Sequence, residues 1–223
     1  METRPAYGAR LAIAAVFALL FAMVVYDVVT SGVLSERDTQ MVAWLHVHGS
    51  AALNTFMTWV SLSGGPAITC AYATALIAAY LARRRIAAAL AVGSIVYGAA
   101  LFNIGVKHVI QRGRPALEDP LMTLPTYSFP SGHAAASTVF GGLICILAWR
   151  SGFRGLRARI AIACAVAWIA LVGISRVYLG LHYPSDVVAG TAEGLFWLMA
   201  WTIAVDRLGI DLRWPTHSST VST

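Results

Sequence analysis

The stretch SRVYLGLHYPSD, residues 175–186, carries an arginine, a histidine and an aspartate between two long apolar runs. The run before it, residues 160–174, has no charged residue, and the run after it, residues 187–205, has only Glu193. Long uncharged runs are typical of segments that cross a bilayer, where ionisable side chains are costly. The sequence therefore predicts that this stretch lies at a membrane boundary, between two spans.

Composition supports a membrane protein throughout. Of the 223 residues, 58% are hydrophobic and 12% are charged, whereas an ordinary soluble domain has roughly 25% charged residues. A helix needs about 20 apolar residues to cross a bilayer. The windows that approach this length are residues 11–29, 66–82, 86–106, 131–149, 160–174 and 187–205. We therefore expect an all-α polytopic fold with six transmembrane helices in a single domain, residues 1–223, the fifth span being short unless it continues through Val177.

The segment between the first two windows, residues 31–65, is too polar to cross a bilayer and too apolar for a free loop. Its Trp44, Phe56 and Trp59 favour short amphipathic helices in the membrane interface, where aromatic rings are enriched. His46 and His48 have no carboxylate or cysteine at ligand spacing, so we interpret them as interfacial histidines and predict no metal site.

The distribution of basic residues predicts the orientation. Placing both termini in the cytoplasm puts eleven of the sixteen there, with Arg37, Lys107, Arg112, Arg114 and Arg176 left outside. Cytoplasmic loops are enriched in Lys and Arg. The net charge of +6 is thus mostly topological and indicates no nucleic-acid partner. We expect an integral membrane protein with both termini in the cytoplasm.

Several of the basic residues left outside are expected on the same side of the membrane as the start of a predicted helix. Lys107, Arg114 and Arg176 all fall on the outer side, together with Ser131 and Gly132 at the beginning of the fourth window. Serine is a good N-cap, and the first amides of a helix attract anions. Arginine matches phosphate oxygens with its planar fork, and lysine adds a point charge. This combination predicts a phosphate site.

Two histidines on the same side point to chemistry on the phosphate. Asp186 follows His182 by four residues and can accept its Nδ1 proton, which leaves Nε2 free to attack phosphorus. His133 is then the candidate general acid for the leaving oxygen. The predicted site needs no metal and no cofactor, because cations and helix amides meet the developing charge.

The three segments resemble the signature motifs of the type 2 phosphatidic acid phosphatase superfamily. They are K-x6-RP from Lys107, PSGH ending at His133, and SR-x5-H-x3-D ending at Asp186. The resemblance implies a six-helix membrane fold with an extracytoplasmic active site. The short loops are similar to those of bacterial members, which implies a protein of a bacterial inner membrane. It further implies that His182 forms a phosphohistidine, that Asp186 is its partner, and that His133 protonates the leaving group. The residues implied to hold phosphate are Lys107, Arg114, Ser131, Gly132, His133 and Arg176.

The substrate stays open at this level. Lipid phosphates and pyrophosphates of the isoprenoid, phosphatidylglycerophosphate and phosphatidate classes all fit, and the oligomeric state is not predicted. The alternatives are a phosphotransferase that uses the same histidine, a vanadate-dependent haloperoxidase, which is disfavoured because those relatives are soluble, and a non-enzymatic anion transporter. A transporter would place ionisable residues deep in several spans, but only Glu193 is clearly intramembrane. We interpret Glu193 as a residue that pairs with an interior partner or hydrogen-bonds across helices, next to the site but without binding the phosphate itself.

Overall fold

The computed structural model describes residues 4–117 and 124–213, and within them the chain forms helices and no strand. The helices are α1 (Arg4–Val29), α2 (Val33–Val47), α3 (Ala51–Ser63), α4 (Pro66–Ala82), α5 (Ile86–Ile110), α6 (Gly132–Arg150), α7 (Gly155–Tyr178) and α8 (Pro184–Arg207). The all-α prediction is confirmed.

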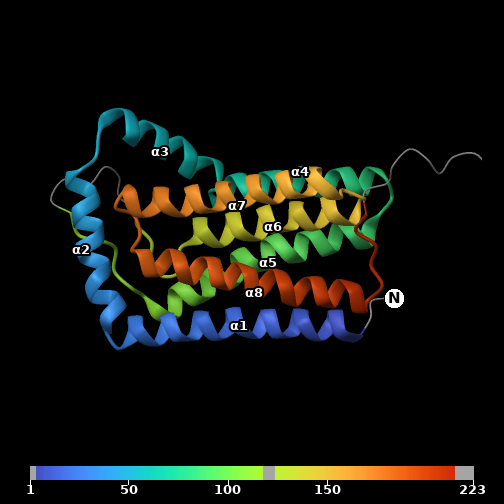
Figure 1. Cartoon of the computed structure of the whole chain (residues 1–223), viewed down its shortest axis with the longest axis horizontal. Helices are drawn as coiled ribbons and strands as arrows, with labels where there is room; N and C mark the ends of the chain where they lie inside the picture. Colours follow the sequence, from blue (N-terminus) through green and yellow to red (C-terminus); the bar gives the residue numbers. More distant parts are fainter. Residues whose placement is uncertain (1–3, 118–123, 214–223) are drawn as a thin grey trace, which may run out of the picture.

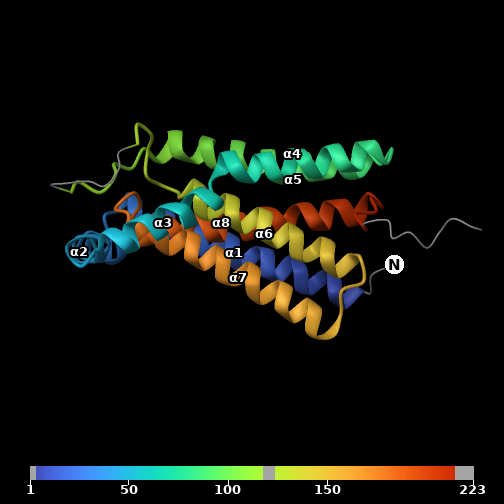
Figure 2. The ribbon, with the colours of Figure 1, turned by 90° about the horizontal axis from the view of Figure 1, so that it is seen from above.

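The long helices run between two ends of the bundle, and α2 lies across one of these ends (Figure 1). The other end holds both the start of α1 and the end of α8, so the described chain begins and finishes on one side (Figure 1). Seen from above, α4 and α5 lie together along one side of the bundle (Figure 2). This course brings the ends of α5 and α7 and the starts of α6 and α8 to the end that α2 covers.

Five helices are long and apolar enough to cross a membrane, and the count becomes six if α3 and α4 form one bent span. These two helices meet at 40°, across Gly64 and Gly65, and Pro66 takes the first position of α4. Proline suits that position because its missing N–H would have no helical partner there. The region expected to hold interfacial helices thus contains α2, which lies across the end of the bundle, and α3, which meets α4 at this bend. The fifth span continues through Val177 to Tyr178.

The core depends on close contact between α6 and α8. A Cβ added to Gly190 of α8 would lie 2.4 Å from the carbonyl oxygen of Ser131. Deeper in the bundle, Leu143 of α6 and Leu198 of α8 are fully buried with Tyr80 and Ile95. Small residues allow helix backbones to approach closely in membranes. Gly190 therefore holds the starts of α6 and α8 together, where the predicted motifs lie.

We expect Gly190→Ala to lower the free energy of unfolding by about 1–3 kcal/mol, as is typical of overpacking. The clash is with backbone, which cannot rotate away as a flexible side chain can. Denaturant titration in detergent micelles, followed by tryptophan fluorescence, measures the loss. Gly105→Ala is the matched control, because a Cβ at Gly105 of α5 meets no described atom within 4 Å. Equal stability of the two variants would show that this helix contact is not tight.

Candidate active site

The residues of the three motifs meet at the end of the bundle that α2 covers. Lys107 lies in the last turn of α5 and Arg176 in the last turn of α7, while Asp186 lies in the first turn of α8. His182 follows α7 after Gly180, whose φ of 68° is a left-handed conformation that suits glycine. This turn directs the chain back into the bundle, and His182 is only 2% exposed.

His182 and Asp186 form the expected pair. Nδ1 of His182 lies 3.3 Å from Oδ2 of Asp186, and Nε2 lies 3.4 Å from Nη1 of Arg114. Burial is the main cause that lowers the pKa of His182 to about 4, although Asp186 acts to raise it. His182 is therefore neutral at neutral pH. A proton on Nδ1, facing the carboxylate, leaves the lone pair on Nε2.

Asp186 is held by more groups than the motif indicates. It is fully buried, and its Oδ2 accepts hydrogen bonds from the Ser128 hydroxyl and from the Tyr183 N–H at 2.9 Å. Its backbone oxygen accepts from the Ser131 N–H at 2.9 Å. Asp186 thus joins the start of α6 to the start of α8, besides orienting His182.

Arg112 is a functional candidate to which sequence reasoning assigned no role. Its Nη1 donates to Oδ1 of Asp186 at 2.6 Å, and its Nη2 donates to Oδ2 of Asp38 at 2.9 Å. Burial acts to lower the pKa of Arg112, but the two carboxylates outweigh it and the pKa is raised. Asp38 belongs to α2, is 3% exposed, and also accepts from the Ser185 N–H at 3.0 Å. The helix across the end of the bundle is therefore tied to the candidate catalytic pair.

Lys107 and Arg114 are bound to loop carbonyls. Nζ of Lys107 donates to the carbonyl oxygens of Tyr127, Ser128 and Pro130, at 3.0, 3.3 and 2.6 Å. Arg114 donates to the carbonyl oxygens of Thr126 and Leu181, at 2.7 and 2.5 Å. Burial is the main cause that lowers the pKa of Arg114, and Asp186 partly opposes it. Both cations therefore shape the loop that leads into α6.

Arg176 differs from the other two cations. It is 3% exposed, and Nη1 donates to the hydroxyl of Ser61 on α3 at 2.5 Å. Its Nε and Nη2 are buried, without a hydrogen-bond partner among the described residues. Buried donors left unpaired are costly, especially on a charged group. Arg176 therefore offers two N–H groups that an anion can satisfy.

The start of α6 contributes to the same place. Ser131 is the N-cap, as expected, and its hydroxyl accepts from the Ala134 N–H at 3.4 Å. The Ser131 N–H is already bonded to Asp186, so Gly132 and His133 are the residues of this turn that line the adjoining cavity. The cavity has a volume of about 310 Å³. The motif side chains that line it are Lys107, Arg114, His133, Arg176 and His182.

Glu193 lies below this cavity. It is 1% exposed, and its Oε2 accepts from the Nδ2 of Asn103 at 2.9 Å. Asn103 in turn lines the cavity, with its Oδ1 3.1 Å from where a Cβ on Gly132 would lie. Glu193 thus contacts the site through Asn103, a residue of α5 that sequence reasoning did not single out.

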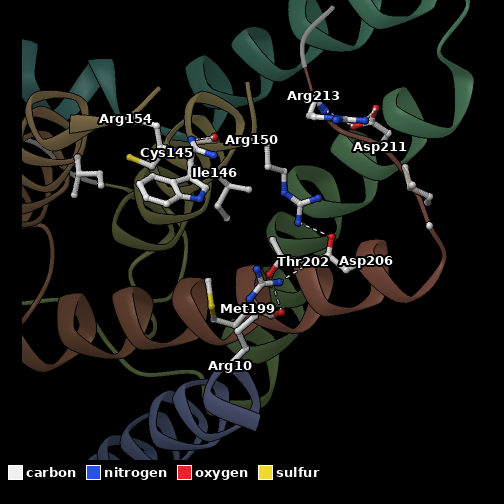
Figure 3. Close-up of a pocket in the computed structure, with 14 residues that line it drawn as sticks. Arg10, Cys145, Ile146, Arg150, Arg154, Met199, Thr202, Asp206, Asp211 and Arg213 are labelled. Carbon is white, nitrogen blue, oxygen red and sulfur yellow. Dashed lines mark hydrogen bonds and ion pairs between the residues drawn. The ribbon is translucent and has the colours of Figure 1, made fainter. Parts of the chain in front are cut away.

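Within residues 4–117 and 124–213, no group of three or more His, Cys, Asp and Glu side chains is placed to hold a metal ion. Glu118 and Asp119, in the connection between α5 and α6, lie outside the described residues. A larger cavity lies at the opposite end of the bundle and contains none of the motif residues (Figure 3).

Comparison with known proteins places the chain in a family. The PAP2 superfamily matches residues 85–210, a stretch that contains all three motifs, and the chain belongs to this superfamily. A crystal structure of a transmembrane PAP2-type phosphatidylglycerolphosphate phosphatase from Bacillus subtilis has a similar fold, with a TM-score of 0.75 at 23% identity. The match covers 89% of this chain and 96% of that one.

Curated relatives have names of lipid phosphatases. The chain is 37% identical to phosphatidylglycerophosphatase B of Bacillus subtilis over 45% of its length and 50% of the relative's. It is 37% identical to lipid A 1-phosphatase of Rhizobium etli, over 52% and 50% of the two chains. For undecaprenyl-diphosphatase of Sulfolobus acidocaldarius the identity is 30%, over 71% and 73%. The chain thus spans about half the length of the first two relatives.

We expect Arg112→Ala to lower the free energy of unfolding by about 3 kcal/mol, because it leaves buried carboxylates without their counter-charge. Denaturant titration in detergent micelles measures the effect. Adding Asp38→Asn to this variant makes one of the carboxylates neutral, so part of the stability returns. Arg37→Ala, an exposed arginine on the same helix as Asp38, is the control for loss of charge alone. No recovery in the double variant would contradict the bridging role of Arg112.

Proposed function

We propose that this protein hydrolyses the phosphate or pyrophosphate group of a membrane lipid through a phosphohistidine at His182. The observation that carries the proposal is Arg176, a buried guanidinium whose Nε and Nη2 have no partner among the described residues, beside a cavity that His182 also lines. Such an arrangement is suited to an anion, and phosphate oxygens match the geometry of the guanidinium. Membership of the PAP2 superfamily supports this choice.

In the first step the Nε2 lone pair of His182 attacks phosphorus, an N–P bond forms, and the P–O bond to the lipid breaks. The imidazole keeps its Nδ1 proton and becomes cationic, and Asp186 at 3.3 Å stabilises that charge. His133 gives its proton to the leaving lipid oxygen, an effect worth about 10² to 10⁴ in rate. Arg176 and Arg114, together with Lys107 when it releases loop carbonyls, bind the phosphoryl oxygens.

In the second step water attacks the phosphohistidine. The N–P bond breaks, the electron pair returns to Nε2 of His182, and the proton of the water passes to His133, which restores both histidines. Protein cations and main-chain amides supply the positive charge, so the mechanism uses no cofactor. An alcohol acceptor in place of water would make the protein a phosphotransferase, the second candidate function.

The cavity supports a lipid as the substrate. Below the polar residues its walls come from Ala99 and Ile104 of α5, Ala136 and Val139 of α6, and Cys70 of α4. An apolar chain can lie there while its phosphate reaches His182. Named relatives act on phosphatidylglycerophosphate, lipid A and undecaprenyl diphosphate, which defines the first panel of substrates to test.

We also propose that the site faces the extracytoplasmic side and that the helices form one membrane-embedded phosphatase unit. The support for the orientation is the excess of arginine at the opposite end, where the RRR turn (residues 83–85) and the α6–α7 connection lie. The positive-inside bias places that end in the cytoplasm.

We expect His182→Ala to abolish phosphate release, because no other described imidazole is paired with Asp186 in this way. Purified protein in detergent with a chelator is assayed for inorganic phosphate across the panel of lipid monophosphates and diphosphates. His48→Ala is the control, since His48 is exposed and bonds to the carbonyl of Trp44. Full activity of His182→Ala, or loss of wild-type activity on chelation, would overturn the mechanism. Phosphate that appears on a second lipid would establish the transferase instead.

Cysteine labelling tests the orientation. In intact cells an impermeant thiol reagent should modify Gly113→Cys, which is exposed beside Arg112 with no described atom within 4 Å of an added Cβ. Arg157→Cys, exposed at the opposite end of the bundle, should react only after the membrane is permeabilised. The reverse pattern would place the site on the cytoplasmic face.

A further inference from the structure

The larger cavity, with a volume of about 870 Å³, lies at the end of the bundle remote from His182. Figure 3 shows Arg10 of α1, Arg150 at the end of α6 and Asp206 near the end of α8 around it. The chain after α8 forms a further wall that includes Asp211 and Arg213. In Figure 2 the end of α6 and the start of α7 diverge from the end of α8. The cavity lies where these helices separate.

Two cations share one carboxylate in this cavity. Arg10 donates to Oδ2 of Asp206 at 2.5 Å, and Arg150 lies 2.7 Å from Oδ1 of the same side chain. On the opposite wall, Nε of Arg213 lies 3.0 Å from Oδ1 of Asp211. Asp211 also forms an ion pair with Arg85, whose Nη2 lies 3.3 Å from Oδ2.

Arg154 has no carboxylate partner in the described part of the chain. Its guanidinium lies over the Trp149 ring, 4.3 Å from the centroid, and donates to the carbonyl oxygens of Trp149 and Phe153. Among the described residues the lining therefore holds four arginines and two aspartates. Arginines that serve only to keep this side of the protein in the cytoplasm need not line a common cavity, because the positive-inside bias depends only on the side of the membrane on which they lie.

The remaining walls are apolar. Ile146 of α6, Ile162 of α7 and Met199 of α8 line the cavity between the arginines and the membrane-spanning part of the bundle. A free phosphate ion would contact only the charged rim. A phospholipid would use both parts, since its phosphate meets arginine and its acyl chain meets the apolar wall. Basic pockets between spans are suited to anionic lipid head groups.

We propose that this cavity binds an anionic phospholipid of the leaflet opposite the candidate active site. Arg154 and Arg150 hold the head-group phosphate, and an acyl chain lies against Ile162 and Met199. The lipid joins α6, α7 and α8 at the end where they separate. The binding does not depend on the hydrolytic function, because no motif residue lines this cavity.

Native mass spectrometry of the detergent-purified protein tests the proposal, with phosphatidylglycerol compared to phosphatidylcholine of the same acyl chains. We expect phosphatidylglycerol to bind at least fivefold more tightly. Arg154→Ala should weaken its binding about fivefold, since a basic residue near an anionic head group contributes about that factor. Arg154→Lys should bind as the wild type does. Arg157→Ala is the control, because Arg157 is exposed on the same side and outside the cavity.

Arg114→Ala distinguishes this binding from lipid binding at the candidate active site. This variant should leave the Arg154-dependent binding unchanged. Denaturant unfolding in detergent micelles that contain phosphatidylcholine checks that Arg154→Ala remains folded. Equal affinities for the two lipids, or equal affinities of the wild type and Arg154→Ala, would overturn the proposal. Complete competition by inorganic phosphate at the concentration of the lipid would also overturn it, in favour of a free-anion site.

Discussion

The carboxylate of Asp186 is the interaction on which the site depends. It is fully buried and pairs with His182 and Arg112. It also accepts hydrogen bonds from the Ser128 hydroxyl and the Tyr183 N–H. The backbone carbonyl of Asp186 accepts a further hydrogen bond from the Ser131 N–H. A buried charge persists only when it is paired and hydrogen-bonded. The starts of α6 and α8 must therefore remain in contact, and Gly190 permits this by leaving space for the Ser131 carbonyl.

The cations around this carboxylate fall into two groups. Lys107 and Arg114 are satisfied by loop carbonyls, and Arg112 is satisfied by two carboxylates. Arg176 retains unpaired donors among the described residues. The first group can hold the loop in shape without a ligand, whereas Arg176 gains its full set of partners only when an anion enters. This division suits a pocket that is formed before its substrate arrives, the preorganisation that electrostatic catalysis requires.

The two ends of the bundle carry different charge arrangements. At the end covered by α2, cations surround a small cavity that continues into apolar walls, and two histidines line it. At the other end, arginines outnumber aspartates around a wider cavity, and no histidine is among its described lining residues. The same residue type thus serves a proposed reaction at one membrane surface and a proposed lipid contact at the other.

The sequence by itself determined the all-α class, the helix starts near Pro66 and Ser131, and the gathering of three motifs on one side, because apolar length and alternating direction depend on local pattern alone. Only the tertiary structure decided that Asp38 of α2 binds Arg112, that Ser61 of α3 binds Arg176, and that Asn103 binds Glu193. These partners are 74, 115 and 90 residues apart. No local pattern encodes such pairs, because they depend on how helices that are distant in the sequence pack against one another.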